Sequence, residues 1–411
     1  MRDAPSKYFS RVKRYILSDG ERFATVVDDA GVPAYYPTAL ALSRRSRGVS
    51  ADTLAAIAGD LVQIGLWAER EGIDLNGRLE NGAYFGSVEV ETLASACGIT
   101  TAALRRLASR QVSEIRHGAS VTKANLVINS LKRRRLETAA AYFNLVGLTS
   151  EAKLPKRSQD RDDRIAGRMT MVEMIKSHRP KMKSSRVRGA VKADQLARVA
   201  AFVVTGSPFS IWADEAIARR NWALITTLIT TGIRQGEARQ LKPADVDLAV
   251  CELRVERRHD DNEDPRKREP NAKTYDRIIP IDPCVAAVLE DYMLGAGSDA
   301  AERRGSAFLF LSHDNRTCGT PLSDRAVQRI VRDLGRHLQI KGLTPHQLRH
   351  GWIQNLARWG LAVDITSEDF DRFANYLGGW SYVRKMASEY RADQLTAAAF
   401  AAGFKVEESR S

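Results

Sequence analysis

The chain has 411 residues, more than one ordinary hydrophobic core accommodates, so two or three domains are expected. A hydrophobic fraction of 44% with 27% charged residues is typical of a globular protein, and no apolar run approaches membrane-spanning length. Because 63 Lys and Arg stand against 50 Asp and Glu, the formal net charge is +13, which favours nucleic acid over an acidic membrane surface as the partner.

The N-terminus and the cysteines bear on compartment and cofactors. The first residues contain no apolar segment of the kind found in signal peptides. The cysteines lie far apart and form no C-x-x-C pair, so we expect buried free thiols and no metal site. These cysteines are Cys97, Cys251, Cys284 and Cys318. A cytoplasmic protein without metal or other cofactor is therefore predicted.

The first 150 residues are predicted to hold an N-terminal extension and a helical domain. Residues 1–49 show short extended pieces broken by turn signals, so they either pack on the surface or form an accessory arm that contacts DNA. From Thr53 onward, apolar residues recur at helical spacing until Gly72. Further helices are expected at 90–96, 100–110 and 121–145, which makes 50–150 a helical DNA-binding domain.

Basic residues are concentrated in this domain and in the segment 151–195, a predicted linker. Thirteen Lys and Arg lie between Lys153 and Lys192, against four Asp and Glu. The segment is either a charged spacer or lies along DNA, and it has room for a helix near 165–177. Basic runs on helices are usually solvated, but their succession here favours contacts with phosphates. The predicted contact residues are Arg105, Arg106, Lys132, Arg133, Arg134, Arg135, Lys181, Lys183, Arg186 and Arg188.

Residues 196–411 are predicted to be mostly helical with one small antiparallel sheet. Residues 246–256 and 275–281 read as strands, and the polar loop 257–272 separates them. Helices are expected at 222–231, 285–294, 323–338, 344–359, 370–377 and 384–400. The expected fold class is therefore mostly α with a small antiparallel β-sheet.

Two arginines from separate segments suit a phosphodiester. Arg234 lies two residues after a glycine in the turn 231–237, and Arg349 lies in the segment 344–350. A guanidinium contacts two oxygens and stays charged at any working pH, so two of them stabilise the charge that grows on a phosphoryl group under attack. Glu237 either forms an ordinary ion pair with Arg234 or holds that guanidinium in place for catalysis.

The remaining candidates supply proton transfer and a nucleophile. His346, Arg349 and His350 share one face of a helix that begins near Pro345. The histidine spacing also fits a metal, but Gln347 cannot serve as the general base of a zinc hydrolase. Lys273, at the end of the polar loop, suits a general acid, with a solvated lysine as the alternative. Tyr390 is the predicted nucleophile, ahead of Tyr376 and Tyr382.

Taken together, these segments resemble the tyrosine recombinase (phage integrase) family over roughly residues 200–400. The segment 231–237 is similar to the motif of the first catalytic arginine, and 344–350 is close to the H-x-L-R-H motif. Lys273 with Arg277 is similar to the β-hairpin lysine segment, and 377–390 resembles the last motif. Many members have histidine where this chain has Gly379, and Trp380 is expected to take that place.

The resemblance implies a two-domain DNA clamp, with 50–150 as the core-binding domain and 196–411 as the catalytic domain. It implies cleavage and rejoining of double-stranded DNA at specific recombination sites through a 3′-phosphotyrosyl link, without cofactor. The expected assembly is a homotetramer on two synapsed sites, helped by accessory DNA-bending proteins, in the integration or excision of a mobile element. The alternatives are a resolvase or transposase of the family, a type IB topoisomerase, and a DNA-binding protein without catalysis.

Overall fold

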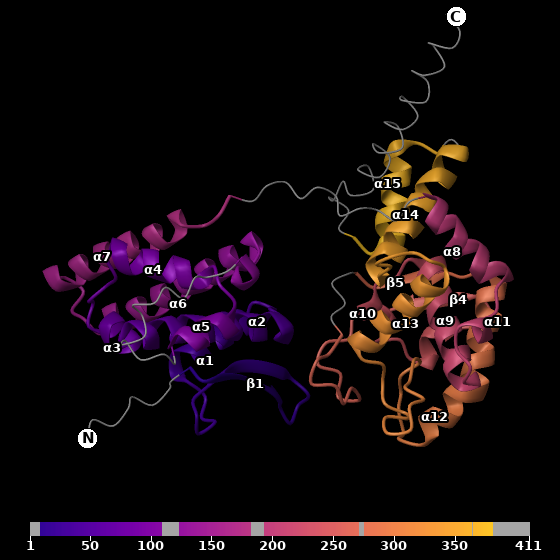
Figure 1. The fold of residues 1–411 in the computed structure, drawn as a ribbon, viewed down its shortest axis with the longest axis horizontal. Helices are drawn as coiled ribbons and strands as arrows, with labels where there is room; N and C mark the ends of the chain where they lie inside the picture. The colour runs from indigo at the N-terminus through magenta and orange to yellow at the C-terminus, as the bar shows by residue number, and fades with distance from the viewer. Residues whose placement is uncertain (1–8, 109–122, 182–192, 271–274, 364, 381–411) are drawn as a thin grey trace, which may run out of the picture. The chain divides into compact units, whose positions relative to one another are not determined.

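The computed structural model describes residues 9–108, 123–181, 193–270, 275–363 and 365–380. The chain divides into two compact units, Met1–Ser185 and Arg186–Ser411, in indigo to magenta and in magenta to yellow in Figure 1. The predicted fold class is confirmed, because each unit is mainly helical with one small antiparallel sheet. Among the helices of these ranges, none has both the length and the apolar character that a membrane crossing requires.

A β-hairpin and a helix open the first unit. Strands β1 (Arg11–Ile16) and β2 (Arg22–Val27) pair antiparallel, and α1 (Tyr35–Arg45) follows them. Every residue of β2 is buried. Its Val26 joins the core of the unit together with Tyr36 and two other side chains of this region, Phe9 and Leu40. Residues 9–49 thus pack into the helical domain, and their contact with DNA stays a prediction.

The helices of the first unit follow the predicted order with shifted ends. The longest of the early ones begins after the N-cap Ser50, not at Thr53, and ends at Gly72, whose φ of 68° is left-handed. The helix expected at 121–145 begins only at Asn129, because Leu126 and Val127 are bridged to residues 98–99. These helices are α2 (Ala51–Glu71), α3 (Leu75–Glu80), α4 (Ser87–Cys97), α5 (Thr101–Ala108), α6 (Asn129–Glu151) and α7 (Gln159–Ser177).

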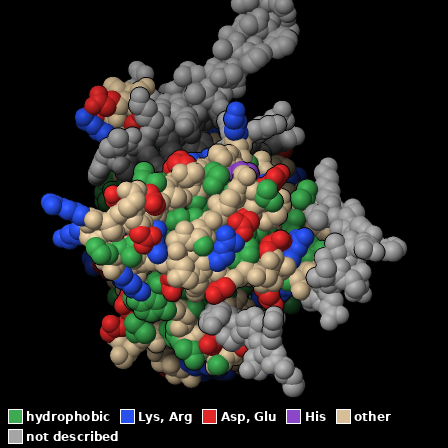
Figure 2. Space-filling model, turned by 90° about the vertical axis from the view of Figure 1, so that its left-hand side faces the viewer, with side chains coloured by type: hydrophobic (Ala, Val, Ile, Leu, Met, Phe, Trp, Pro, Cys, Tyr) green, Lys and Arg blue, Asp and Glu red, His purple; other side chains and the backbone are tan. Residues whose placement is uncertain are grey.

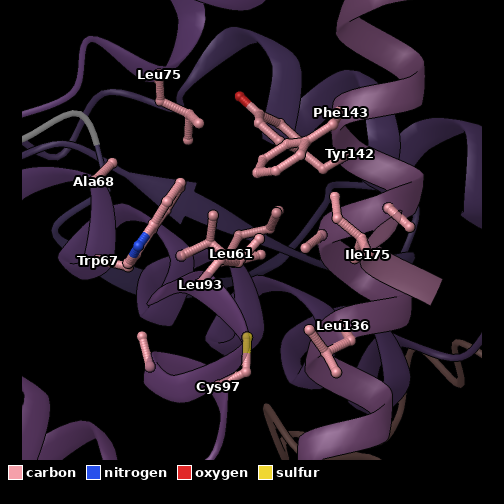
Figure 3. Close-up of a cluster of buried hydrophobic side chains, with 14 of the residues drawn as sticks. Leu61, Trp67, Ala68, Leu75, Leu93, Cys97, Leu136, Tyr142, Phe143 and Ile175 are labelled. Carbon is pink, nitrogen blue, oxygen red and sulfur yellow. The ribbon is translucent and has the colours of Figure 1, made fainter. Parts of the chain in front are cut away.

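The core of the first unit lies between α2, α4, α6 and α7 (Figure 3). Trp67 of α2 and Phe143 of α6 both pack against Phe85. Ile175 of α7 is fully buried in the same cluster. Buried Arg168 of α7 also pairs with buried Glu151 at 2.6 Å. Most of the described part of the expected linker 151–195 is therefore a helix of the first unit, because its apolar face completes this core.

The second unit surrounds a three-stranded sheet with helices. Strands β3 (Val246–Asp247), β4 (Glu252–Val255) and β5 (Arg277–Pro280) pair antiparallel in that order. The predicted strand 246–256 is divided into β3 and β4, which pair with each other, and the predicted strand 275–281 corresponds to the shorter β5. Its helices are α8 (Ala193–Thr205), α9 (Glu215–Thr231), α10 (Gln235–Ala238), α11 (Pro283–Tyr292), α12 (Ser298–Glu302), α13 (Asp324–His337), α14 (Pro345–Ala362) and α15 (Ser367–Gly378). The predicted helix 384–400 lies outside the described residues.

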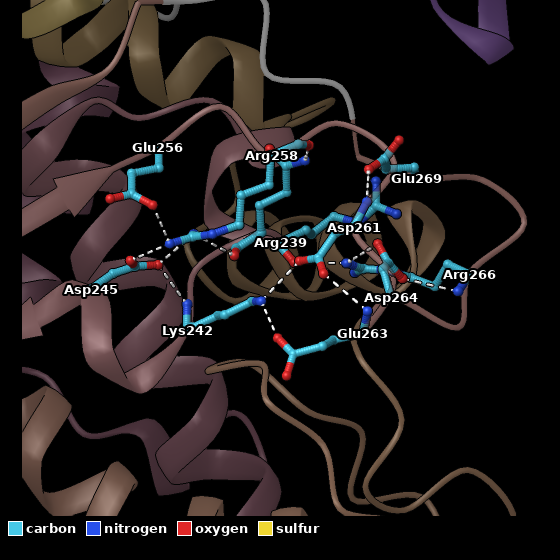
Figure 4. Close-up of polar contacts among 11 residues, drawn as sticks. Arg239, Lys242, Asp245, Glu256, Arg258, Asp261, Glu263, Asp264, Arg266 and Glu269 are labelled. Carbon is cyan, nitrogen blue, oxygen red and sulfur yellow. Dashed lines mark hydrogen bonds and ion pairs between the residues drawn. The ribbon is translucent and has the colours of Figure 1, made fainter. Parts of the chain in front are cut away.

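The polar loop between β4 and β5 is tied down by ion pairs (Figure 4). Arg258 contacts buried Asp245 at 2.6 Å, and Lys242 contacts Asp261 at 2.9 Å. Arg266 pairs with buried Asp264 at 2.8 Å and donates to the carbonyl oxygen of Arg239 at 3.0 Å. The charged residues of this polar loop therefore fix it to the unit.

The cysteines are free thiols, as predicted, but their burial differs from the prediction. Only Cys97 is buried, and burial raises the pKa of its thiol to about 12. Cys284 is exposed, while Cys251 and Cys318 are partly exposed.

Candidate active site

Arg349 is the central side chain of the site. It lies in the first turns of α14 and is only 4% exposed. Its guanidinium donates at 2.6 Å to the carbonyl oxygen of Gly232 and at 2.6 Å to that of Gly378. The guanidinium carbon lies 4.8 Å from the ring centre of Trp380. Arg349 therefore joins the ends of two helices, because Gly232 follows α9 and Gly378 is the last residue of α15.

Arg234 reaches the same carbonyl oxygen of Gly378. A left-handed Gly232, with φ of 64°, ends α9 and lets the chain turn into α10, whose N-cap is Arg234. Arg234 Nη1 lies 3.5 Å from the oxygen of Gly378. This side chain is 29% exposed. Two guanidinium groups from separate segments thus converge on one oxygen atom.

Glu237 is completely buried and supports this turn. Its carboxylate accepts the backbone N–H of Arg234 at 2.7 Å and lies 3.7 Å from Nη1 of the same residue. Arg277 of β5 donates two hydrogen bonds to the carboxylate, at 3.1 and 3.2 Å. Glu237 thus forms the expected ion pair and also holds the backbone of Arg234, while its part in catalysis stays a prediction.

Arg277 is the residue whose role the sequence did not indicate. Besides Glu237, its Nε donates to the carbonyl oxygen of Leu377 at 2.7 Å, and its side chain is 1% exposed. The burial of β5 alternates, with Arg277 and Ile279 inward and Ile278 outward. A charged residue at an inward strand position is the signal that marks a buried ionic partner.

The two histidines of α14 contact each other. Nε2 of His346 lies 2.8 Å from Nε2 of His350. Burial, with the nearby imidazole of His346 and the charge of Arg349, lowers the pKa of His350 to about 4. His350 is therefore neutral at pH 7, and in this contact it accepts a hydrogen bond when His346 carries its proton on Nε2.

Trp380 takes part in the site through its ring face. Gly379, with φ of 62°, caps α15, and the backbone N–H of Trp380 returns to the carbonyl oxygen of Asn375 at 2.9 Å. This turn leaves the indole 5% exposed and stacked on the guanidinium of Arg349. Whether its N–H contacts phosphate stays a prediction.

Two predicted catalytic residues, Lys273 and Tyr390, lie outside the described residues. Tyr376, a competing candidate for the nucleophile, is 41% exposed, and its hydroxyl accepts the backbone N–H of Ile278 at 3.3 Å. In the described ranges, no group of three or more His, Cys, Asp or Glu is arranged to hold a metal ion.

The predicted DNA-contact residues fall into three classes. The predicted contact of Arg135 with DNA is wrong, because this residue is 6% exposed. Its guanidinium donates to the carbonyl oxygens of Cys97 and Ile99 at 3.1 and 2.6 Å. Arg134 and Arg133 reach solvent but form ion pairs with Asp60 and Glu137.

The others are exposed, partly exposed, or outside the described ranges. The backbone around Gly98 lies close to Lys132, which is partly exposed. The exposed ones are Arg105, Arg106 and Lys181, and those outside are Lys183, Arg186 and Arg188. The face in Figure 2 mixes blue and red side chains with hydrophobic ones, so it is not a basic patch.

Comparison with known proteins assigns the site-bearing part of the chain. Residues 191–394, about half of the chain, match the model of the phage integrase family. The tyrosine recombinase XerC of Herpetosiphon aurantiacus is 27% identical over 141 residues, which are 34% of this chain and 40% of that protein. XerD of Mycobacterium leprae is 27% identical over 162 residues, 38% of this chain and 45% of that protein. The chain therefore belongs to the phage integrase, or tyrosine recombinase, family through this region.

The chain spans less than half the length of these curated relatives. Among solved structures, XerA recombinase is 16% identical, with a TM-score of 0.34 over 87% of this chain and 97% of that one. XerH bound to its difH substrate is 13% identical, with a TM-score of 0.36 over 77% of this chain and 84% of that one. Scores at this level add nothing to the assignment.

Proposed function

We propose that the chain is a site-specific recombinase that cleaves and rejoins DNA strands through a covalent link to Tyr390. The observation that carries the proposal is the convergence of Arg234 and Arg349 on the oxygen of Gly378. Preorganised cations at one point stabilise the charge that develops on a phosphoryl group under attack. Family membership supports the same assignment, since the region 191–394 contains these residues.

The proposed step exchanges one ester for another. The phenolic oxygen of Tyr390 attacks the scissile phosphorus, and the bond to the 5′-oxygen breaks. His346 takes the phenolic proton, and Lys273 gives a proton to the departing 5′-oxygen. Arg234 and Arg349 bind the non-bridging oxygens. The 5′-hydroxyl of a partner strand then reverses the step, and no other reactant is needed because the phosphotyrosyl bond conserves the ester.

The proposed partner is double-stranded DNA with specific sites. The net charge of +13 supports binding to a polyanion. Among the solved structures similar to this chain, XerH is bound to difH and an integrase of transposon Tn1549 is bound to DNA of the transposon right end. We propose a homotetramer on two synapsed sites of a mobile element, with the two units closing around the duplex and accessory DNA-bending proteins assisting.

The test is a covalent trap on a nicked duplex that carries a candidate site from DNA flanking the gene. Wild-type protein is incubated with it in chelator and run on a denaturing gel. We expect a slowly migrating protein–DNA band that is lost in Tyr390→Phe. A band that survives in Tyr390→Phe and is lost in Tyr376→Phe would move the nucleophile to Tyr376. Tight site binding without any band would indicate a DNA-binding protein without catalysis.

Relaxation of supercoiled DNA without recombinant products would instead indicate topoisomerase activity. Relaxation and recombination are both measured with the same protein preparations on a supercoiled plasmid that carries two sites. The trap is also run without chelator. A band that forms only without chelator would point to a metal-dependent reaction and contradict the proposed chemistry.

A further inference from the structure

Arg277 connects three segments that meet at the candidate active site. It lies on β5, and its Nη atoms grip both oxygens of Glu237 at 3.1 and 3.2 Å. Its Nε donates to the carbonyl oxygen of Leu377 at 2.7 Å. Both ionic side chains are almost fully buried, at 1% and 0% exposed. All three bonds form at a planar fork, so they fix the relative positions of the partners.

Each partner of Arg277 also contacts, or is next in sequence to a residue that contacts, one of the arginines proposed to bind phosphate. Glu237 accepts the backbone N–H of Arg234 at 2.7 Å, which sets the start of α10. The next residue after Leu377 is Gly378, whose carbonyl oxygen Arg349 and Arg234 share. A displacement of Arg277 therefore moves both the turn that carries one arginine and the acceptor that orients the two.

We propose that Arg277 is a positioning residue that aligns Arg234 and Arg349 for catalysis. The inference rests on the proposed function for its consequence in DNA cleavage, but the alignment itself is a property of the protein alone. Arg277 does not act on the phosphate, since its guanidinium is enclosed by Glu237 and the end of α15. Loss of alignment lowers the rate of cleavage and leaves the many contacts that bind DNA in place.

Strand β5 contains a second contact to α15 that helps to isolate the role of Arg277. The backbone N–H of Ile278 donates to the hydroxyl of Tyr376 at 3.3 Å. Tyr376→Phe removes this bond and leaves the bonds of Arg277 in place. Loss of alignment in Arg277→Lys but not in Tyr376→Phe would thus separate the guanidinium from general docking of the strand.

The first experiment observes the arginines without DNA. NMR spectra of the guanidinium N–H groups are recorded for wild type and Arg277→Lys, with Arg220→Met as a matched control. Arg220 is also buried in the second unit and donates to the carbonyl oxygen of Leu311 at 2.7 Å. We expect slowly exchanging signals of Arg234 and Arg349 in wild type and Arg220→Met, and averaged signals in Arg277→Lys. Unchanged signals in Arg277→Lys would overturn the proposal.

The second experiment measures cleavage at saturating DNA. We expect Arg277→Lys to form the covalent complex about 100-fold more slowly, with a Kd within about threefold of wild type. A duplex with sulfur in place of the 5′-bridging oxygen is tested in parallel, because a thiolate leaves without a proton. The defect should persist on this duplex. Full recovery would place the effect on Lys273, four residues upstream, and contradict the proposal.

Folding is controlled with a charge-balanced pair of variants. Arg277→Met leaves Glu237 buried without this partner, so it is also studied together with Glu237→Gln. If the two residues act as one unit, the double variant cleaves no more slowly than the slower single variant. Multiplied defects would show independent roles and count against the proposal. If wild type gives no covalent complex but its arginines lose order in Arg277→Lys, the proposed function fails and the positioning role stands.

Discussion

Arg135 in the first unit and Arg349 in the second have similar surroundings at first inspection. They are 6% and 4% exposed, and each donates hydrogen bonds to two backbone carbonyl oxygens near helix ends. Their charged neighbours differ. Arg135 lies 3.9 Å from the buried carboxylate of Asp60, whereas Arg349 shares an acceptor with a second arginine, Arg234.

This difference separates an arginine that stabilises a fold from one that serves a reaction. In the first unit a carboxylate sits beside the buried positive charge, so a further anion gains little there. In the second unit two guanidinium groups meet at one oxygen, and the carboxylate of Glu237 lies 3.7 Å from Arg234. A phosphate bound at this point would be stabilised by both guanidinium groups. The comparison predicts that truncating Arg349 slows the reaction, whereas truncating Arg135 lowers the stability of the fold.

The largest effect is expected for Arg349→Ala. Its removal should slow formation of the covalent complex about 1000-fold, because a preorganised donor to the phosphoryl oxygens is lost. Site binding should stay within roughly tenfold, since most affinity comes from many phosphate contacts. Single-turnover kinetics on the nicked duplex and a binding titration measure the two quantities. If affinity falls as much as the cleavage rate, Arg349 contributes to DNA binding and has no separate role in the reaction.

The matching truncation in the first unit, Arg135→Met, should act on stability. It leaves the carbonyl oxygens of Cys97 and Ile99 without this donor, which costs about 2 kcal/mol in the free energy of unfolding. Urea denaturation checks this value. The cleavage rate per folded molecule should equal that of wild type. A slower reaction at unchanged stability would place Arg135 at the DNA, where the basic run first suggested it.

The sequence reveals the site more fully than it reveals the use of each arginine. Motif spacing predicts that Arg234, Arg349 and the histidines belong together, and the structure confirms that the arginines meet. The run 132–135 reads as uniformly basic, yet one turn of helix points its members in different directions. Burial of Arg135 depends on the end of α4, 38 residues away, which no local pattern encodes.

The segment 151–195 shows the same limit. Its composition indicates a charged linker, but Met171 and Ile175 face the core of the first unit. They lie at positions i and i+4, a helical spacing that can be recognised in the sequence. What the sequence does not show is the surface of α6 that accepts them, because a core is formed by elements that are distant along the chain. The high charge of α7 conceals its narrow apolar face.

A moderate effect is expected from the exposed basic residues. Replacing Lys132 with Ala should weaken DNA binding across all sequences and reduce the salt slope by about one. Arg134→Ala should change the slope less, since this guanidinium is paired with Asp60 at 2.8 Å. Affinities at several salt concentrations measure both slopes. A larger change for Arg134 would show that the ion pair opens when DNA binds.

The smallest effect concerns His350, which senses the charge of Arg349. Burial is the main cause that lowers the pKa of His350 to about 4, and His346 and Arg349 add to it. In the unfolded chain the pKa is ordinary, near 6.5. As pH falls from 6.5 towards 4, the unfolded state binds a proton that the folded state does not, so this histidine makes the fold less stable over that window.

Two measurements follow from this linkage. Between pH 7 and pH 5, the melting temperature of His350→Asn should fall less than that of wild type. In Arg349→Met, the imidazole titration of His350 followed by NMR should move upward, because a neighbouring positive charge is gone. Arg135→Met, distant in sequence and in the other unit, should leave that titration unchanged. A midpoint that stays at about 4 in Arg349→Met would mean that burial and His346 set the pKa without a contribution from Arg349.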